Sequence, residues 1–430
     1  MKIMTSRSAF ALAGLSFFAA CQSPPPKPTW HRDIAPLMEE KCGGCHSAGS
    51  IGPFSLTTHA EVMAVAESVR AAVTSRRMPP WPARRDCAEY APDGSLTDEQ
   101  IALITGWLDD GAMEGDPRDY QALEGPKTSL SRVDLTLPMV KPYTPKKMPD
   151  DYRCFVLDWP ETEPKYITGF NLAPGVNAMV HHADVLYVPP EKAAEFRAND
   201  PNGDGWECYN PPILEGYWIG TFVPGSLGMD FPAGSGLKVE PGSKVFIQFH
   251  YNTAATNGPK PDLSKLELSL ADKAKPGLVV ALAKVSWLRE RAMRIPAFEK
   301  DVMHRYEEDP TKIISVFNRE FVDGLPLKAY ATIIHMHEMG SKATFEIMRK
   351  DGTKECVNDI PKWEFHWQLP YSLKTPKTVY PGDQVAIECH WDNSQENQPY
   401  INGIQRVPRE LNWGPNTDDE MCVAGVYFTH

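Results

Sequence analysis

The sequence has no excess of positive charge: 44 lysines and arginines stand against 56 aspartates and glutamates, for a formal net charge of −12 at pH 7. This balance argues against a nucleic-acid partner. The sequence also contains no phosphate-binding glycine-rich loop and no Ser/His/Asp set of the hydrolytic kind. Long helical periods are scarce, because 40 prolines and 30 glycines among 430 residues favour turns and short extended segments. A chain of this length suggests roughly three domains.

No apolar run near the N-terminus is long enough to span a bilayer, since the run Ala9–Ala20 covers only about 12 residues. After a basic start, such a run is typical of a signal peptide. The segment from Phe18 to Cys21 resembles a bacterial lipobox, although phenylalanine replaces the usual leucine, so plain signal cleavage stays an alternative. We expect residues 1–21 to be a lipoprotein signal peptide with Cys21 lipidated, and residues 22–28 a proline-rich tether. The mature protein would then be exported to the periplasmic side of the bacterial outer membrane, anchored by its lipid.

A covalent haem signature follows the tether. Cys42, Cys45 and His46 form the pattern C-x-x-C-H, in which two thiols bind the haem vinyl groups and the histidine is the proximal iron ligand. A zinc knuckle or a thioredoxin-like redox pair has similar spacing, but the redox pair usually lies in a βαβ pattern, which this segment lacks. We therefore expect one haem c here.

The surroundings of this signature predict a small helical domain over residues 29–121. Two capping boxes, Thr58-x-x-Glu61 and Thr97-x-x-Gln100, each open a stretch with helical spacing of apolar residues. Between them, Met78 lies in a proline-rich loop that resembles the distal methionine loop of a class I cytochrome c. Met78 is thus the expected second iron ligand, and Met63, inside the first helical stretch, is its competitor.

Residues 122–150 form a proline-rich linker, and after it the pattern changes to short extended segments bounded by Pro, Gly and Asp turns. The remaining stretch of about 280 residues is too long for one ordinary sandwich. We expect two, at residues 151–287 and 288–430. The predicted fold class is multidomain, with a small all-α domain followed by two all-β sandwich domains.

Histidines cluster on the predicted strands of both sandwiches. In the second, His335 and His337 point to the same side of one strand, because side chains alternate along a strand. In the first, the adjacent His181 and His182 would face opposite ways on a regular strand. They can share an ion with His250 only if the strand bends or if different ring nitrogens bind, and His250 could instead be a plain surface histidine. Three histidines with one open position would suit copper or zinc.

A methionine near the C-terminus makes the second cluster a softer one. Met421 lies in the segment Glu420-Met421-Cys422, and a thioether beside two imidazoles favours Cu(I) over zinc or iron. Met336 and Met339 are rival thioethers, although Met336 alternates with the two histidines and therefore points away from them.

The order of these motifs resembles that of the copper type II, ascorbate-dependent monooxygenases, which include peptidylglycine α-hydroxylating monooxygenase and dopamine β-monooxygenase. The resemblance covers about residues 150–430. It implies two jelly-roll-like sandwiches that face each other across a solvent-filled cleft, with an electron-transfer copper in the first and an oxygen-binding, substrate-hydroxylating copper in the second. The implied ligands are His181, His182 and His250 for the first copper, and His335, His337 and Met421 for the second.

Six of the nine cysteines remain for disulfides after lipidation and haem attachment are assigned, and disulfides are allowed in an exported protein. The expected pairs are Cys389–Cys422, which the resemblance implies, and Cys154–Cys208, within the first sandwich. Cys87 and Cys356 are left over. A bond between these two would tie the helical domain to the second sandwich.

The chain departs from the family pattern where the peptide hydroxylase binds its substrate carboxylate. Ile333 stands where that enzyme has an arginine, and Gly425 where it has a tyrosine. A glycine-extended peptide is therefore not the expected substrate. The fused haem domain is a second departure, because the animal enzymes take their electrons from ascorbate.

We therefore predict a copper-dependent monooxygenase with two copper ions and one haem c. It would hydroxylate a C–H bond of a small-molecule or peptide-like substrate with dioxygen, and an external donor would supply electrons through the haem. The alternative is a non-enzymatic copper-binding, electron-relay lipoprotein. A zinc hydrolase built on His335 and His337 is a third hypothesis, weakened by the softness of Met421 and by the absence of a carboxylate at suitable spacing.

Overall fold

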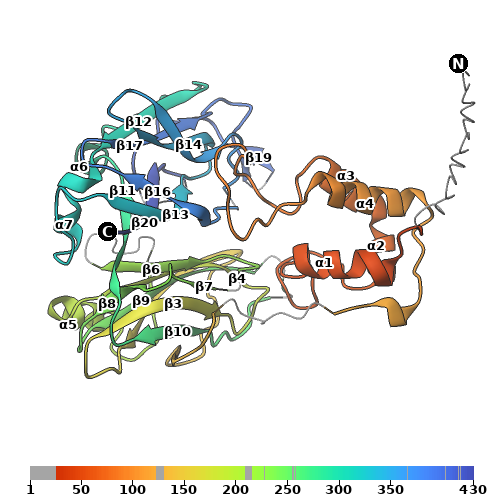
Figure 1. Cartoon of the computed structure of the whole chain (residues 1–430), viewed down its shortest axis with the longest axis horizontal. Coiled ribbons are helices and arrows are strands. Elements are labelled where there is room, and N and C mark those ends of the chain that lie inside the picture. Colours follow the sequence, from red (N-terminus) through yellow and green to blue (C-terminus); the bar gives the residue numbers. More distant parts are fainter. Residues whose placement is uncertain are drawn as a thin grey trace, which may run out of the picture.

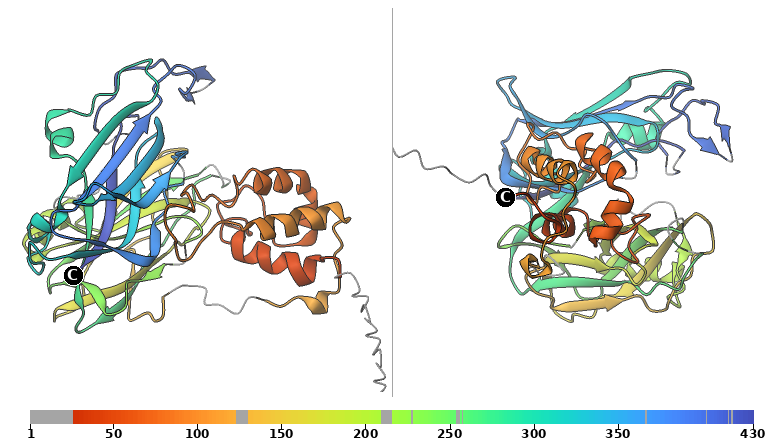
Figure 2. Two further views of the ribbon diagram at one scale, coloured as in Figure 1. Left: turned by 45° about the horizontal axis from the view of Figure 1, so that its top comes forward. Right: turned by 90° about the vertical axis from the view of Figure 1, so that its right-hand side faces the viewer.

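The computed structural model describes residues 26–122, 130–208, 216–226, 228–253, 256, 258–365, 367–401, 403–414, 416 and 418–430. The predicted signal peptide with Cys21, and the first part of the tether, lie outside the described residues. Figure 1 shows a helical region beside two stacked β bodies, and Figure 2 shows the same arrangement from two other sides. Within the described ranges, no helix is both long and apolar enough to cross a membrane.

The helical region forms where the capping boxes predicted it. The Thr58 and Thr97 side chains each accept a hydrogen bond from the backbone N–H three residues on. The Glu61 and Gln100 side chains accept from the backbone N–H of Thr58 and Thr97 in turn, so both boxes are complete. The first stretch does not form one helix, because the backbone leaves the helical conformation at Val65. The elements are η1 (Trp30–Ile34), α1 (Ala35–Lys41), α2 (His59–Ala64), α3 (Ala66–Thr74), α4 (Asp98–Asp109) and η2 (Pro117–Asp119). Their apolar faces share one core around Trp30, Ile34 and Trp107.

The first β body is a sandwich. Its five-stranded sheet has the order β5-β2-β9-β4-β6 and packs against strands β1, β10, β3 and β8 of a larger sheet, with β7 paired to β3. The bounds are β1 (Leu135–Pro138), β2 (Asp150–Asp158), β3 (Lys165–Ala173), β4 (Val180–Val188), α5 (Pro190–Asn199), β5 (Trp206–Glu207), β6 (Tyr217–Phe222), β7 (Met229–Asp230), β8 (Ser235–Val239), β9 (Lys244–Asn252) and β10 (Lys265–Ala271).

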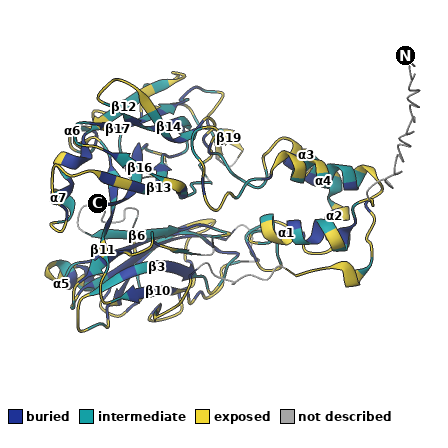
Figure 3. Cartoon of the chain, in the orientation of Figure 1, coloured by how far each residue is buried: buried dark blue, intermediate teal, exposed yellow. Residues whose placement is uncertain are grey.

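The second β body packs a four-stranded sheet, β12-β17-β14-β15, against the strands β11-β20-β13-β16. The bounds are β11 (Lys275–Leu282), α6 (Val285–Glu290), β12 (Val302–Glu308), η3 (Pro310–Lys312), α7 (Ile314–Phe317), β13 (Leu327–His335), β14 (Gly340–Met348), β15 (Lys354–Ile360), β16 (Tyr371–Val379), β17 (Gln384–Trp391), β18 (Tyr400–Ile401), β19 (Ile404–Gln405) and β20 (Val423–Thr429). Buried residues concentrate inside the two bodies (Figure 3), as expected for all-β domains.

Strand β11 joins the two bodies. It pairs with β8 of the first body in parallel over two residues and with β20 of the second in antiparallel over six. The side chains of Leu278, Val280 and Leu282 lie in the core of the second body. Although β11 precedes the predicted boundary at 287/288, it packs mainly with the second sandwich.

Three disulfides are present in the described part of the chain. The two expected pairs, Cys389–Cys422 and Cys154–Cys208, are confirmed. The two cysteines left over in the sequence are joined as well, in a Cys87–Cys356 bond.

The segment after α3 docks on the second sandwich around that last disulfide. Arg84 N donates to Asp359 O at 2.8 Å, and Tyr90 forms a β-bridge with Leu373 of β16. The side chain of Tyr90 is buried in the core of the second sandwich. The helical region is therefore held to this sandwich by backbone pairing, apolar burial and a covalent bond.

Replacing both cysteines of this bond, in a Cys87→Ser/Cys356→Ser variant, should release the segment. We expect a loss of about 3 kcal/mol of stability, because the bond closes a long loop. Hydrogen–deuterium exchange should rise in residues 84–91 and 354–360. A Cys154→Ser/Cys208→Ser variant is the matched control, and its exchange should rise around β2 and β5 instead. Unchanged exchange in residues 84–91 would contradict the covalent tether.

Candidate metal centres

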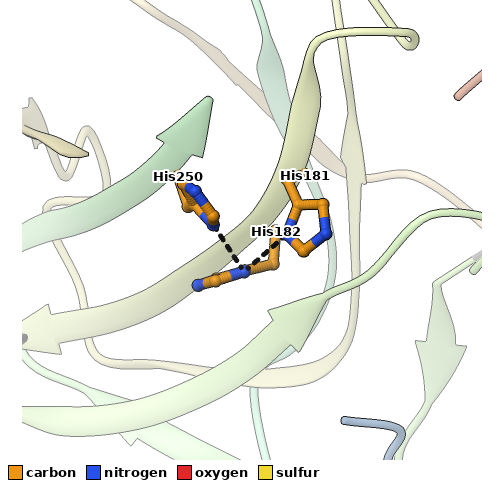
Figure 4. Close-up of side chains that lie close together, drawn as sticks. All are labelled: His181, His182 and His250. Carbon is orange, nitrogen blue, oxygen red and sulfur yellow. Dashed lines mark hydrogen bonds between the residues drawn. The ribbon is translucent and has the colours of Figure 1, made fainter. Parts of the chain in front are cut away.

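Three histidines of the first sandwich converge on one point. His181 and His182 come from β4 and His250 from the neighbouring β9, and Figure 4 shows their rings turned toward one another. The His182 Nδ1 atom lies 3.2 Å from His181 Nδ1 and 3.3 Å from His250 Nδ1. Three nitrogens about 2.0–2.1 Å from one ion in trigonal or tetrahedral geometry would be about 3.3–3.6 Å apart. Both distances from His182 are close to this range, and one ligand atom from each of the three histidines lies within 4.8 Å of the others, so the three could hold a metal ion together.

A β-bulge allows the two adjacent histidines to share this point. The pairing of β4 with β9 changes register between Val180 and His182, where His181 is the extra residue. A bulge bends the strand and re-aims the side chain at that position. The bend that the adjacent pair requires is thus present in the strand itself.

His250 is held by groups that the sequence analysis did not single out. Its Nε2 atom lies 2.8 Å from Asp150 Oδ1, and its ring stacks on Tyr152 with centroids 4.2 Å apart. The hydrogen bond from His250 lowers the pKa of Asp150. A carboxylate on one ring nitrogen fixes a histidine for metal binding through the other. Only 4% of His250 is exposed, so the alternative of a surface histidine is wrong.

In the second cluster the Nε2 atoms of the histidines face each other, whereas in the first cluster the Nδ1 atoms do. His335 Nε2 and His337 Nε2 lie 3.2 Å apart. The Nδ1 atom of His335 lies 2.6 Å from Gln368 Oε1, and that of His337 lies 3.2 Å from Asp419 O. Because both Nδ1 atoms face acceptors, each ring carries its proton there and turns a lone pair on Nε2 toward the other. Burial lowers the pKa of His335, and it lowers that of His337 to about 3, so both rings are neutral.

The structure also narrows the choice of thioether. Met336 is fully buried in the hydrophobic core, and Met339 Sδ accepts a hydrogen bond from Gln398 at 3.3 Å. Strand β13 pairs His335 with Val423 of β20. If this antiparallel register is extended by two residues, Met421 lies opposite His337. Met421 therefore stays the best candidate ligand.

Glu420 organises the segment that follows the His-x-His motif. Its buried carboxylate accepts hydrogen bonds from His337 N at 3.0 Å, Met339 N at 2.7 Å and Trp391 Nε1 at 2.8 Å. Burial raises the pKa of Glu420 to about 8, while these donors act in the opposite direction. In the sequence, Glu420 is recognisable only as a neighbour of Met421, and no local pattern indicates these contacts.

The two clusters face each other across the sandwiches. Burial lowers the pKa of His182 well below its usual range, and the rings of His250, His181 and, from the other sandwich, His335 add to this lowering. Strands β4 and β13 lie on the facing sides of the two bodies (Figure 1). The first cluster thus brings its Nδ1 atoms together on the first body, and the second cluster brings its Nε2 atoms together on the second body.

The haem signature lies at the end of α1. His46 Nδ1 is 2.9 Å from Phe54 O, which leaves its Nε2 atom available for a metal. Cys42 and Cys45 form no disulfide, and burial raises the pKa of Cys42 to about 12. A cavity of about 650 Å³ adjoins the signature at Gly43 and Ser47 and extends to Trp30 and His59. Its size is typical of a cofactor pocket.

The two candidates for the second iron ligand differ in their surroundings. Met78 follows α3 and is half-buried, with its N–H donating to Ala72 O at 3.2 Å. Met63 lies inside α2 and is 40% exposed. Met78 stays the better candidate, and its role stays a prediction.

Removing the Glu420 side chain should loosen the second cluster, although this side chain does not contact the imidazole nitrogens of His335 or His337. In Glu420→Ala, three buried N–H donors lose their acceptor, at a cost of about 3 kcal/mol or more, since each costs about 1–3 kcal/mol. Thermal unfolding of the metal-free chain measures this loss. Glu410→Ala, which removes an exposed ion pair with Arg294, is the control and should change stability by less than about 1 kcal/mol. Equal effects of the two variants would contradict the role given to Glu420.

Comparison with known proteins adds a family match to this geometry. Residues 315–430 match the family model for the copper type II ascorbate-dependent monooxygenase, C-terminal domain. The matched part contains His335, His337 and Met421, together with the disulfide-bonded Cys389 and Cys422.

Curated relatives extend the likeness toward the first sandwich. The human DBH-like monooxygenase protein 1 is 22% identical over 367 residues, which is 78% of this chain and 55% of the relative. Dopamine beta-hydroxylase of Canis lupus familiaris is 25% identical over 104 residues, or 24% of this chain and 15% of the relative. The chain thus spans about half the length, or less, of these relatives.

A solved structure of tomato vicilin matches 65% of this chain and 74% of its own, at 12% identity. Its TM-score of 0.14 is too low to support an argument about fold. Residues 315–430 are thus similar to the C-terminal domain of the copper type II ascorbate-dependent monooxygenases, and a larger part of the chain is similar to a DBH-like monooxygenase protein.

Proposed function

We propose that this chain is a copper-dependent monooxygenase that hydroxylates a C–H bond with dioxygen and receives its electrons through a fused haem c. The observation that carries the proposal is the pair of facing histidine clusters on two sandwiches, one of them within the segment that matches the family model. The balanced reaction is R–H + O₂ + 2e⁻ + 2H⁺ → R–OH + H₂O.

The donor sets of both clusters fit copper. His181, His182 and His250 offer three imidazole nitrogens within 4.8 Å of one another, and His335 and His337 offer two more, 3.2 Å apart. Copper, when bound, would supply one-electron chemistry and dioxygen activation. Burial lowers the pKa of His182, His335 and His337, and the chain orients His250, His335 and His337 through Asp150, Gln368 and the Asp419 carbonyl, respectively.

The signature residues fit a haem c in the same way. Two free thiols and a histidine oriented through Nδ1 lie in one short segment, and Gly43 and Ser47 of the same segment line a cavity of about 650 Å³. We propose Met78 as the second iron ligand and residues 29–121 as a class I cytochrome c domain. A haem passes one electron at a time, so each hydroxylation requires two deliveries from an external one-electron donor.

The substrate should lack a carboxylate at the second cluster. Ile333 and Gly425, the two departures from the peptide hydroxylase pattern, are direct partners in the β13–β20 pairing. A Cβ on Gly425 would lie only 2.7 Å from Ile333 Cγ2, so an isoleucine methyl fills this position. An apolar contact therefore occupies the place expected for a carboxylate-binding pair.

A copper-binding relay lipoprotein without enzymatic activity is the second candidate, because it would need the same ligands. Product carrying ¹⁸O from labelled dioxygen distinguishes the enzyme from the relay. In either case we propose that the signal peptide is cleaved just before Cys21 on export, that Cys21 is lipidated, and that the protein lies on the periplasmic side of the outer membrane. Loss of membrane association in Cys21→Ser tests the anchor.

Copper content per haem tests the two metal sites. After loading with Cu(I) and desalting, we expect two coppers per haem. A His335→Ala/His337→Ala variant should retain one, because the three-histidine cluster is intact. His390→Ala is the control: this histidine of the second sandwich contacts Asp301 and Glu388 instead, and two coppers should remain. Zinc in place of copper, or no metal, would contradict the proposal.

Haem attachment is expected to be independent of copper. In Cys42→Ala/Cys45→Ala, the covalent haem band on a denaturing gel should disappear while two coppers still bind the folded sandwiches. Met78→Leu should keep the covalent haem and lose the methionine-to-iron absorption band. Persistence of that band would transfer the ligand role to another residue, such as Met63.

A further inference from the structure

The haem signature touches the first sandwich at a close contact between two glycines. A Cβ on Gly44 would lie 3.1 Å from Gly225 Cα, and a Cβ on Gly225 would lie 3.2 Å from Cys45 Sγ. Gly225 follows β6 and has a φ of +82°, which favours glycine. The backbone of the sandwich therefore approaches the thiol that would carry the haem.

A second contact at the same place runs through side-chain hydrogen bonds. Asn177 Nδ2 donates to Ser50 Oγ at 3.1 Å, and Ser50 Oγ donates to Gly44 O at 2.9 Å. Ser50 is only 6% exposed, so water competes little for these bonds. Asn177 belongs to the turn that leads into β4, in which Val176 O accepts from Met179 N and Val180 N.

These contacts connect the haem signature to the first histidine cluster. Gly44 is bonded to Cys45, and His181 lies four residues after Asn177 on a continuous backbone. Along this route from Cys45 to His181, two steps are non-covalent, and both are the hydrogen bonds just described.

The helical region offers another approach, toward the second cluster. The ring of Trp81, three residues after Met78, lies 5.0 Å from that of Tyr371, and Tyr371 pairs with Thr332 on β13. Thr332 is three residues before His335. This route crosses a ring-to-ring gap, where electronic coupling falls off faster with distance than it does along hydrogen bonds and covalent bonds.

We propose that electrons pass from the haem to the first cluster along Cys45, Gly44, Ser50, Asn177 and His181. The inference rests on the proposed function, in which a haem reduces a copper held by His181, His182 and His250. In each transfer one ferrous haem is oxidised to ferric haem and one Cu(II) is reduced to Cu(I), with no bond made or broken. An external one-electron donor then reduces the haem again.

Stopped-flow spectroscopy of the copper-loaded, full-length protein tests the route. The haem is reduced with less than one equivalent of dithionite in the absence of oxygen and substrate, and its reoxidation by Cu(II) is followed by absorbance. Asn177→Ala and Ser50→Ala should slow this phase severalfold, whereas Ser50→Thr, which keeps the hydroxyl, should retain the original rate. Asn199→Ala removes a hydrogen bond to Glu195 O elsewhere on the same sandwich and is the control.

Two further measurements show whether a slower transfer in a variant comes from the lost hydrogen bond or from a disturbed structure. Haem potential and copper content should be unchanged in Asn177→Ala. In the copper-free protein, hydrogen exchange should increase in residues 44–52 for Asn177→Ala and in residues 371–374 for Trp81→Leu. If Trp81→Leu slows haem oxidation and Asn177→Ala does not, the route is wrong and electrons pass through the second sandwich. If the original protein, with both metals bound, shows no haem oxidation by copper, the haem relay itself fails.

Discussion

Backbone hydrogen bonds of strand β20 join the strand that carries His335 to a sheet that continues into the first sandwich. This strand pairs with β11 on one side and with β13 on the other, and β11 in turn pairs with β8 of the first sandwich. The Cys389–Cys422 disulfide fixes the start of β20 to β17. One continuous sheet therefore links the strand of His335 to the first sandwich, and apolar packing within that sandwich holds β4 and β9, which carry the first cluster, against this sheet.

At both clusters, burial lowers the pKa of histidine side chains. Removing the rings from water lowers the pKa of His182, His335 and His337, so that each ring keeps a lone pair for a metal at neutral pH. The two clusters differ in the nitrogen they present, Nδ1 in the first and Nε2 in the second, because their hydrogen-bonding partners occupy opposite sides of the rings. With Met421 as the expected third ligand of the second cluster, the two sites would differ in softness.

Local patterns made much of this predictable. Strand alternation placed His335 and His337 on one side of a strand, and the capping boxes marked the starts of two helices correctly. The bulge at His181 was not predictable, because it arises from pairing with β9, whose register no local pattern contains. Asp150 and Glu420 were missed for the same reason. Asp150 contacts His250, 100 residues away, and Glu420 contacts the backbone of His337, 83 residues away, and only the fold creates these contacts.

The central claim is that one chain holds two copper ions, one in each facing cluster. Crystals of the copper-loaded protein, measured with X-rays just above and just below the copper absorption edge, test it most directly. The account predicts two anomalous peaks, one among the Nδ1 atoms of His181, His182 and His250 and one beside the Nε2 atoms of His335 and His337, with the Met421 sulfur in contact. A single peak, or peaks away from these nitrogens, would contradict it.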